Sequence, residues 1–230
     1  MDALIENFFN LRTMLDMLPG LIREGIRNTI FLTVAGFSLG LVLGLVFALL
    51  RLSTARPLRW LAGTYIELFR GLPLLLTIVF IGTALPIALR FRWPNFFLPG
   101  VLALGIVAGA YIAETIRAGI QAVPRGQMEA ARSLGMPHRL AMRTIVLPQA
   151  FRIIVPPLTN ELVLLIKDTS LLAILGTSIG QREILKYSRD VLGRTLDPSA
   201  LVAAGLAYLA LTVPMTRLVA VLERRNRRSR

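Results

Sequence analysis

Long stretches without a charged residue are the clearest pattern along the chain. Four of them are each long enough to cross about 30 Å of hydrocarbon as a helix, and they cover residues 28–50, 71–89, 93–113 and 198–216. A fifth stretch, 153–181, is equally apolar but is interrupted by Glu161, Lys167 and Asp168. Because charges in lipid are costly, these side chains are expected to face protein or water. The pattern predicts an all-α, polytopic membrane protein with five transmembrane helices.

The predicted organisation has three parts, and the basic residues orient them. They are an outer N-terminal segment at 1–20, a transmembrane domain at 21–222 and a basic cytoplasmic tail at 223–230. Within the domain, the spans are expected at about 28–50, 68–89, 98–121, 155–180 and 198–218, with a cytoplasmic loop at 122–150. With the N-terminus outside, 16 Lys and Arg residues lie on the inner side and 9 on the outer side. The positive-inside rule therefore favours an outer N-terminus and an inner C-terminus.

Composition changes how the charge is interpreted. A net charge of +13 would suggest a nucleic-acid-binding protein, but the chain is 55% hydrophobic and has a mean hydropathy of +0.66. Charged residues make up only 17% of it, too few to cover a soluble protein of this apolarity. The excess charge thus reflects topology, and no nucleic-acid partner is expected. The absence of cysteine and the presence of one histidine, His138, argue against thiol chemistry, zinc sites and a membrane hydrolase.

The loop after the third span carries the most specific motif. Residues 128–134 favour a helix, Gly135 can adopt the left-handed conformation that ends it, and Pro137 suits the first turn of a second short helix. The small side chains of Ala130 and Ala131 beside Glu129 predict a shallow surface that a partner groove could grip. The motif reads Glu129-Ala130-Ala131, then Gly135, then Ile145, then Leu147-Pro148.

This spacing resembles the loop motif of the membrane-spanning subunits of bacterial ABC importers. Three further segments resemble the branch for polar amino acids, namely 67–73, 110–114 with Arg117, and 167–171. The resemblance implies a type I ABC importer permease fold in the bacterial inner membrane. It also implies a second permease subunit, identical or homologous, an ATPase dimer inside and a periplasmic or membrane-anchored solute-binding protein outside.

By this resemblance, the loop would hold the helix that couples the permease to the ATPase. The implied coupling residues are Glu129, Ala130, Ala131, Ser133, Leu134 and Gly135. The sequence has no Gly-x-x-x-x-Gly-Lys-Ser/Thr motif, so ATP and Mg²⁺ are expected on the partner. The chain itself is expected to be a transport subunit without enzymatic activity, cofactor or metal.

Polar residues within the spans predict a substrate path, because each is costly in lipid. The candidates are Glu114, Asn160, Glu161, Lys167, Asp168, Thr169 and Ser170. Those at 160, 161, 167 and 168 share one helical stripe, and its mixed charges suit the zwitterion of an α-amino acid. In a second interpretation, Lys167 and Asp168 pair within a permease dimer and hold a gate. Glu114 and Arg117, three residues apart, could pair with each other or reach toward the stripe.

Two further alternatives remain open at this point. An ion-coupled secondary transporter or channel could use Glu114 and Asp168 as a proton or cation relay. Gly36, Gly40 and Gly44 form a small-residue stripe in the first span that favours either internal packing or a dimer contact. The sequence does not indicate which amino acid is carried.

Overall fold

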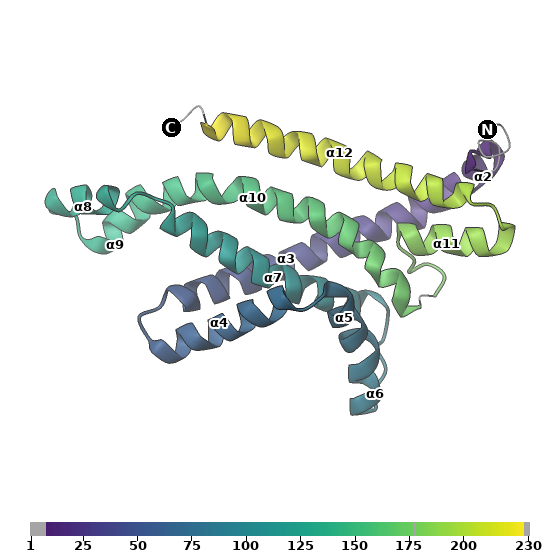
Figure 1. Ribbon diagram of the computed structural model, residues 1–230, viewed down its shortest axis with the longest axis horizontal. Coiled ribbons are helices and arrows are strands. Elements are labelled where there is room, and N and C mark those ends of the chain that lie inside the picture. The colour runs from purple at the N-terminus through teal and green to yellow at the C-terminus, as the bar shows by residue number, and fades with distance from the viewer. Residues whose placement is uncertain (1–7, 177, 228–230) are drawn as a thin grey trace.

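The fold consists of helices and connecting loops, as the sequence predicts. The structure is a computed structural model that describes residues 8–176 and 178–227, and no β-strand occurs among them. Long helices run side by side along the longest axis of the molecule (Figure 1). α8 and the C-terminal end of α12 lie at one end, and α2 and α11 lie at the other. We refer to these as the α8 end and the α11 end.

The first long helix extends well beyond the expected first span. α2 (Leu11–Gly20), the π-helical turn η1 (Leu21–Ile26) and α3 (Arg27–Leu52) follow one another without a break over 42 residues. At 1.5 Å per residue such a helix is roughly 60 Å long, about twice the thickness of the hydrocarbon core. Its first part therefore projects from the apolar stretch at 28–50.

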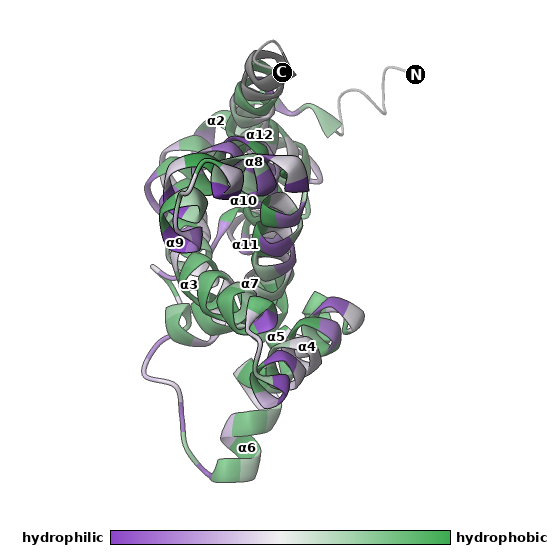
Figure 2. Ribbon diagram, turned by 90° about the vertical axis from the view of Figure 1, so that its left-hand side faces the viewer, coloured by the Kyte–Doolittle hydropathy of each residue, from purple (hydrophilic) through white to green (hydrophobic). Residues whose placement is uncertain are grey.

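The segment expected to form the second span is sharply bent. α4 (Arg56–Gly71) is followed by α5 (Leu74–Val79), the π-helical turn η2 (Phe80–Ala84) and α6 (Leu85–Leu89), and the two helical parts meet at 104°. The break falls at Leu72 and Pro73, which are extended because the residue before a proline avoids the helical region. The range 68–89 is thus not one straight helix, and α6 projects away from the bundle (Figure 2).

In the second half of the chain, one long helix replaces two elements that the sequence predicts separately. α7 (Phe97–Gln121) leads to α8 (Arg125–Ser133), and α9 (His138–Ala141), η3 (Met142–Val146) and α10 (Leu147–Asp168) then form one uninterrupted helix. The expected second short helix is therefore wrong, since it is the first part of a helix that ends at Asp168. A 3₁₀ segment η4 (Thr169–Leu175), α11 (Ile184–Thr195) and α12 (Ser199–Arg227) complete the chain.

Three helical segments in the described part of the chain are long and apolar enough to span a membrane. They are Leu11–Leu52, Phe97–Gln121 and Ser199–Val221, and the bent pair of α4 with 74–89 would add a fourth. α10 is not among them, and it carries Glu161, Lys167 and Asp168. A fifth span thus requires that these charges lie away from lipid.

The most extensive contact between helices of the described residues joins α3 to α7, and it explains the glycine stripe. A Cβ atom added to Gly40 would lie 3.0 Å from the Cβ atom of Ala108, and one added to Gly36 would lie 3.1 Å from that of Leu104. Small residues let two backbones approach in this way. Of the two interpretations of the stripe, the structure shows internal packing. The adjoining core is made by Leu32, Ile78, Leu104, Ile112, Leu165 and Leu172.

Candidate functional site

The segment predicted to couple the permease to an ATPase forms a short helix closed by a glycine turn. Gly135 has φ +83, in the left-handed region, directly after α8. The Met136 N–H donates to the Ala131 carbonyl at 3.1 Å and the Gly135 N–H donates to the Arg132 carbonyl at 3.0 Å. These two bonds define the Schellman ending of a helix. The predicted helix and glycine turn are confirmed, while Pro137 caps the next helix rather than forming its first turn.

α8 presents most of the predicted coupling residues to solvent. Glu129, Ala130, Ser133 and Gly135 are exposed, and Leu134 is 85% exposed. Ala131, however, is buried at 2% exposure and faces the protein. The expected shallow surface therefore includes Ala130 but not Ala131, because successive residues on a helix point in different directions.

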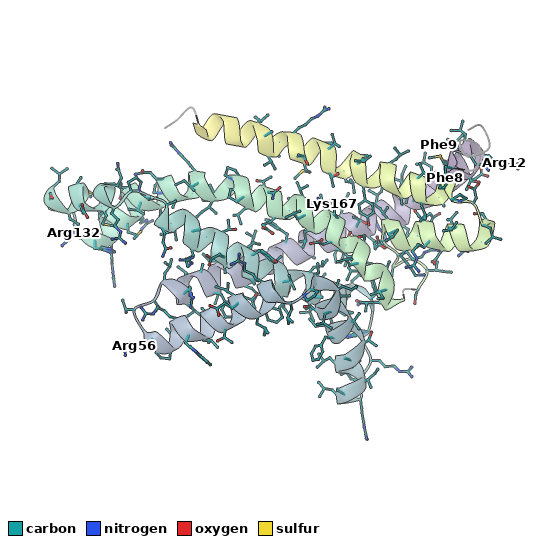
Figure 3. All side chains as sticks on the ribbon, in the orientation of Figure 1. Phe8, Phe9, Arg12, Arg56, Arg132 and Lys167 are labelled. Carbon is teal, nitrogen blue, oxygen red and sulfur yellow. The ribbon has the colours of Figure 1, made fainter. Side chains whose placement is uncertain are left out.

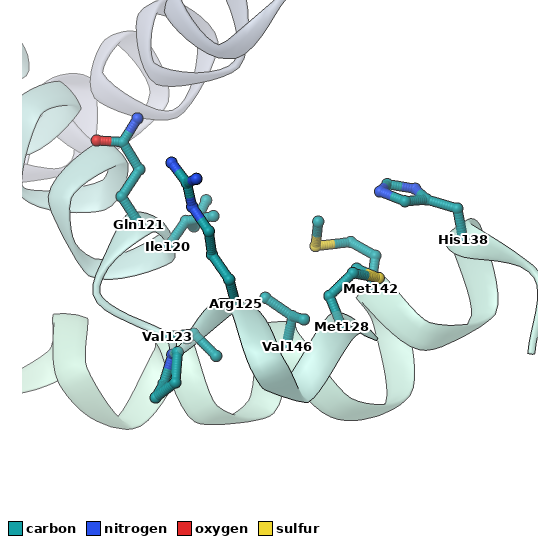
Figure 4. Close-up of a pocket in the computed structure, with 9 residues that line it drawn as sticks. Ile120, Gln121, Val123, Arg125, Met128, His138, Met142 and Val146 are labelled. Atoms are coloured by element: carbon teal, nitrogen blue, oxygen red, sulfur yellow. The ribbon is translucent and has the colours of Figure 1, made fainter. Parts of the chain in front are cut away.

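A cavity of about 400 Å³ lies behind α8, where it meets the end of α7 and η3 (Figure 4). Met128 and Met142 meet in its centre, with Arg125 on one side and His138 on the other. His138 is exposed, as the sequence predicts. Beneath the cavity, Val123, Val146, Ala150 and Ile154 form a small core. Met128 of α8 packs against this core, which attaches α8 to the base of the long helix that includes α10.

That long helix carries the predicted path residues toward the middle of the molecule. Lys167 lies partway along the longest axis, far from Arg132 at the α8 end (Figure 3). Asn160 and Lys167 are exposed and Glu161 and Asp168 are half-buried, so these four occupy an accessible side of α10. Ser170, also half-buried, lies in η4, while Thr169 is completely buried and its hydroxyl donates to the Ile166 carbonyl at 2.7 Å. The structure thus groups four of the candidates on α10, leaves Ser170 accessible beyond its end and places Thr169 inside.

Glu114 pairs with Arg117 and does not reach toward the stripe on α10, the other possibility that the sequence left open. The Arg117 Nε donates to Glu114 Oε2 at 2.9 Å, a second guanidinium nitrogen donates to Oε1, and a third reaches Gln121 at 2.5 Å. Both side chains of the pair are about a quarter exposed. Glu114 therefore belongs to a local ion pair rather than standing alone in the path.

Arg70 is the polar residue of this region that the sequence analysis left out of the candidate path. It lies close enough to both Glu114 and Glu161 to interact with each electrostatically, and its guanidinium is 5.5 Å from the ring centroid of Tyr111. Arg70 falls at the start of the expected second span, 68–89, and is not among the predicted path residues. The bend after α4 keeps Arg70 beside α7 and α10. Pro73, in the segment 67–73, is the sequence feature that indicates such a bend.

A second polar cluster, at the α11 end, lies in the segment between the last two expected spans. Arg182 forms an ion pair with Glu24 at 2.6 Å and another with Asp190 at 3.5 Å. The Asn28 side chain donates to the Gly180 and Arg182 carbonyls at 3.0 Å each. These contacts attach the loop before α11 to the first long helix. These contacts could not be predicted from the sequence alone.

Glu183, the next residue, is completely buried and caps α11. It accepts hydrogen bonds from the Leu185 N–H, the Lys186 N–H and the Tyr208 hydroxyl at 2.7, 2.6 and 2.8 Å. Burial raises the pKa of Glu183 to about 7, although these hydrogen bonds and the charge of Lys186 act in the opposite direction. A carboxylic acid with this pKa changes charge near neutral pH.

The raised pKa of Glu183 predicts a pH-dependent stability. The folded protein retains the proton up to about pH 7, and the unfolded chain only up to about 4.5. The resulting stabilisation is complete below the lower value and is lost as the pH rises through 7, amounting to about 2 kcal/mol between pH 5.5 and 8. The melting temperature in detergent should therefore be higher at pH 5.5 than at pH 8, and we expect Glu183→Gln to remove this difference. Glu67→Gln, at a solvent-exposed carboxylate, is the control and should retain it.

No group of three or more His, Cys, Asp or Glu side chains within 8–176 and 178–227 is arranged to hold a metal ion.

Comparisons with known proteins agree with the fold and the motif. Residues 40–228 match the family described as "Binding-protein-dependent transport system inner membrane component". The chain is 37% identical over 204 residues to the arginine transport system permease protein ArtQ of Bacillus subtilis, covering 89% of this chain and 91% of that protein.

Two further relatives extend the likeness. The chain is 40% identical over 211 residues to the probable glutamine ABC transporter permease protein GlnM of Bacillus subtilis, covering 90% and 93% of the two chains. It is 34% identical to a chain in the crystal structure of an amino acid ABC transporter with histidines, with a TM-score of 0.84 over 92% and 96% of the chains. The chain therefore belongs to the family of binding-protein-dependent transport system inner membrane components, and it is an amino-acid ABC importer permease by sequence and fold.

Proposed function

We propose that this chain is one of two permease subunits in an ATP-driven importer of polar amino acids. Its relatives named for arginine and glutamine transport, at 37% and 40% identity, support this class of cargo. The α8 end would face the cytoplasm and the α11 end the outside of the bacterial inner membrane, with five spans that include α10. The second permease subunit is an identical or homologous copy.

The observation that carries the proposal is the exposed helix α8 with its glycine turn. Its exposed residues would dock on an ATPase subunit, which would bind ATP and Mg²⁺ and carry out the hydrolysis. Since the helix from His138 to Asp168 is continuous, a displacement of α8 and the core beneath it would reach Lys167 and Asp168. Such a movement could open the permease alternately to the two sides of the membrane.

The open face of α10 is the proposed substrate path. A free amino acid carries a carboxylate and an ammonium group, and this face offers Lys167 together with Glu161 and Asp168. Asn160 and Ser170 would contribute uncharged polar groups. Thr169 is buried and would support the path from beneath without reaching the cargo. Arg70 adds a cation near the Glu114 and Glu161 side chains. A solute-binding protein would deliver the amino acid at the α11 end.

The alternative of an ion-coupled transporter or channel is not favoured by the family match. The Glu114–Arg117 ion pair also argues against a proton relay at Glu114, because both of its carboxylate oxygens already accept hydrogen bonds from the Arg117 guanidinium.

Reconstitution tests this proposal directly. The permease would be assembled in vesicles with its ATPase and candidate binding proteins, and uptake of labelled Arg, His, Gln, Glu and Asp would be measured. We expect uptake of at least one of them to require ATP and to persist when ion gradients are collapsed. Uptake that follows the gradients instead would support the secondary transporter, and transport of none of the five would refute the substrate class.

A further inference from the structure

Four elements meet at one buried polar cluster at the α11 end. The Tyr208 hydroxyl, on α12, donates to Glu183 Oε2 at 2.8 Å and lies close to the side chain of Thr169. Glu183 caps α11, and Thr169 is the first residue of η4. Beside them, the Ile184 N–H donates to the Thr29 hydroxyl of α3 at 3.2 Å. The tyrosine hydroxyl thus bonds to the helix cap of α11 and lies beside the junction between α10 and η4.

This cluster is more than a helix cap requires. A cap needs only a short side chain that accepts the first backbone N–H groups, and such residues are usually exposed. Here the capping carboxylate has no solvent exposure, and a tyrosine from the apolar helix α12 completes its hydrogen bonds. Buried polar groups that are fully hydrogen-bonded fix the relative positions of the elements that supply them. The cluster therefore holds α11, α12 and η4 in one arrangement.

The position of Thr169 connects this arrangement to the proposed path. Thr169 directly follows Lys167 and Asp168 and precedes Ser170, whose hydroxyl donates to the Lys167 carbonyl at 2.7 Å. Any shift of η4 against α10 therefore moves these side chains. On the other side of the cluster, α11 displays the exposed cations Arg189 and Arg194 at the α11 end.

We propose that Tyr208 and Glu183 are positioning residues that couple α11 to the path residues 167–170 through the hydroxyl of Tyr208. The inference rests on the proposed function, in which the solute-binding protein arrives at the α11 end. Its contact with α11 then shifts η4 through this cluster and promotes turnover. The two residues act through Thr169 and do not touch the cargo.

The test uses the complete transporter with Tyr208→Phe, which removes one hydroxyl and keeps the ring. We expect ATPase activity stimulated by the binding protein, and uptake, to fall about tenfold, the effect of losing one hydrogen bond to a charged group. The binding-protein concentration for half-maximal stimulation and the unstimulated ATPase activity are expected to stay at wild-type values, and the melting temperature to fall by only the few degrees that one lost hydrogen bond costs. Tyr187→Phe is the control. It removes a hydroxyl at the same end of the molecule whose hydrogen bond to the Met17 carbonyl is long, at 3.4 Å.

A second measurement follows η4 itself and does not depend on activity. The chain contains no cysteine, so Ile174→Cys, at a half-exposed position of η4, gives a single labelling site. We expect its labelling rate to change when the loaded binding protein is added, and this change to disappear in Tyr208→Phe. Glu183→Gln should abolish it as well, because its amide would oppose a backbone N–H donor.

The outcomes separate this inference from the function on which it rests. Unchanged stimulation and an unchanged labelling response in Tyr208→Phe would overturn the coupling role. A parallel loss of assembly and of unstimulated ATPase activity, with a melting temperature lowered by more than one hydrogen bond explains, would also overturn it, since it would show a purely structural role. Failure of the proposed function would appear differently, as absence of ATP-dependent uptake by the wild-type transporter.

Discussion

Replacement of Leu134 by aspartate is expected to reduce ATP-dependent uptake by about two orders of magnitude while leaving the permease folded. Leu134 is 85% exposed at the end of α8, so the chain itself loses little packing. On docking, burial of this leucine in a groove of the ATPase would contribute about 2 kcal/mol. An aspartate buried there instead would add a desolvation cost. Together these correspond to an association weakened by roughly a hundredfold. Copurification of the ATPase and uptake in vesicles measure the effect.

A leucine at the opposite end of the molecule provides the matched control. Leu196 is 83% exposed, directly after α11, and Leu196→Asp should leave the ATPase bound. Glu129→Lys and Gly135→Asp extend the test to the charge and to the glycine turn, where a residue other than glycine is strained at φ +83. If all three variants of the α8 segment kept their ATPase partner and full uptake, the coupling assignment would be wrong.

The features that could be predicted from the sequence are those set by local chemistry. Gly135 ends α8 because glycine adopts positive φ without steric cost, and the glycine stripe of α3 faces α7 because close helix packing needs small residues. Glu114 and Arg117 pair because they are three residues apart on one helix. The glycine turn and the ion pair are each contained within a single helix or turn, whereas the sequence predicted the stripe on α3 but not the helix that it faces.

The features that escaped prediction depend on how distant elements meet. Arg70 reaches α7 and α10 because the chain bends by 104° after α4, and a proline in the sequence does not give the direction of a bend. Ala131 faces inward because η3 packs behind α8, whereas its neighbour Ala130 is exposed. Glu183 was one acidic residue in a charged segment. It is completely buried in the fold, where Tyr208 of α12 donates a hydrogen bond to it.

The prediction with the largest expected effect on folding concerns Gly44. A Cβ atom at this position would lie 2.5 Å from Cγ2 and 2.8 Å from Cβ of Ile112, and 3.1 Å from the backbone nitrogen of Ala113. The first two atoms are held by a β-branched side chain and the third by the α7 backbone, so α3 and α7 must move apart. Gly44→Ala should therefore lower stability by about 1–3 kcal/mol, and Gly44→Val should prevent assembly.

The control for Gly44 is a glycine in a helix with open space around it. No atom lies within 4 Å of a Cβ added to Gly205 on α12, so Gly205→Ala should leave the melting temperature unchanged or slightly raised, since alanine favours helix. Melting temperature and dimer content in detergent would be measured for both variants. If Gly44→Ala retained its melting temperature but dissociated the permease dimer, the glycine stripe would be a contact between subunits. A lowered melting temperature, already evident in the single subunit, is what the observed contact between α3 and α7 requires.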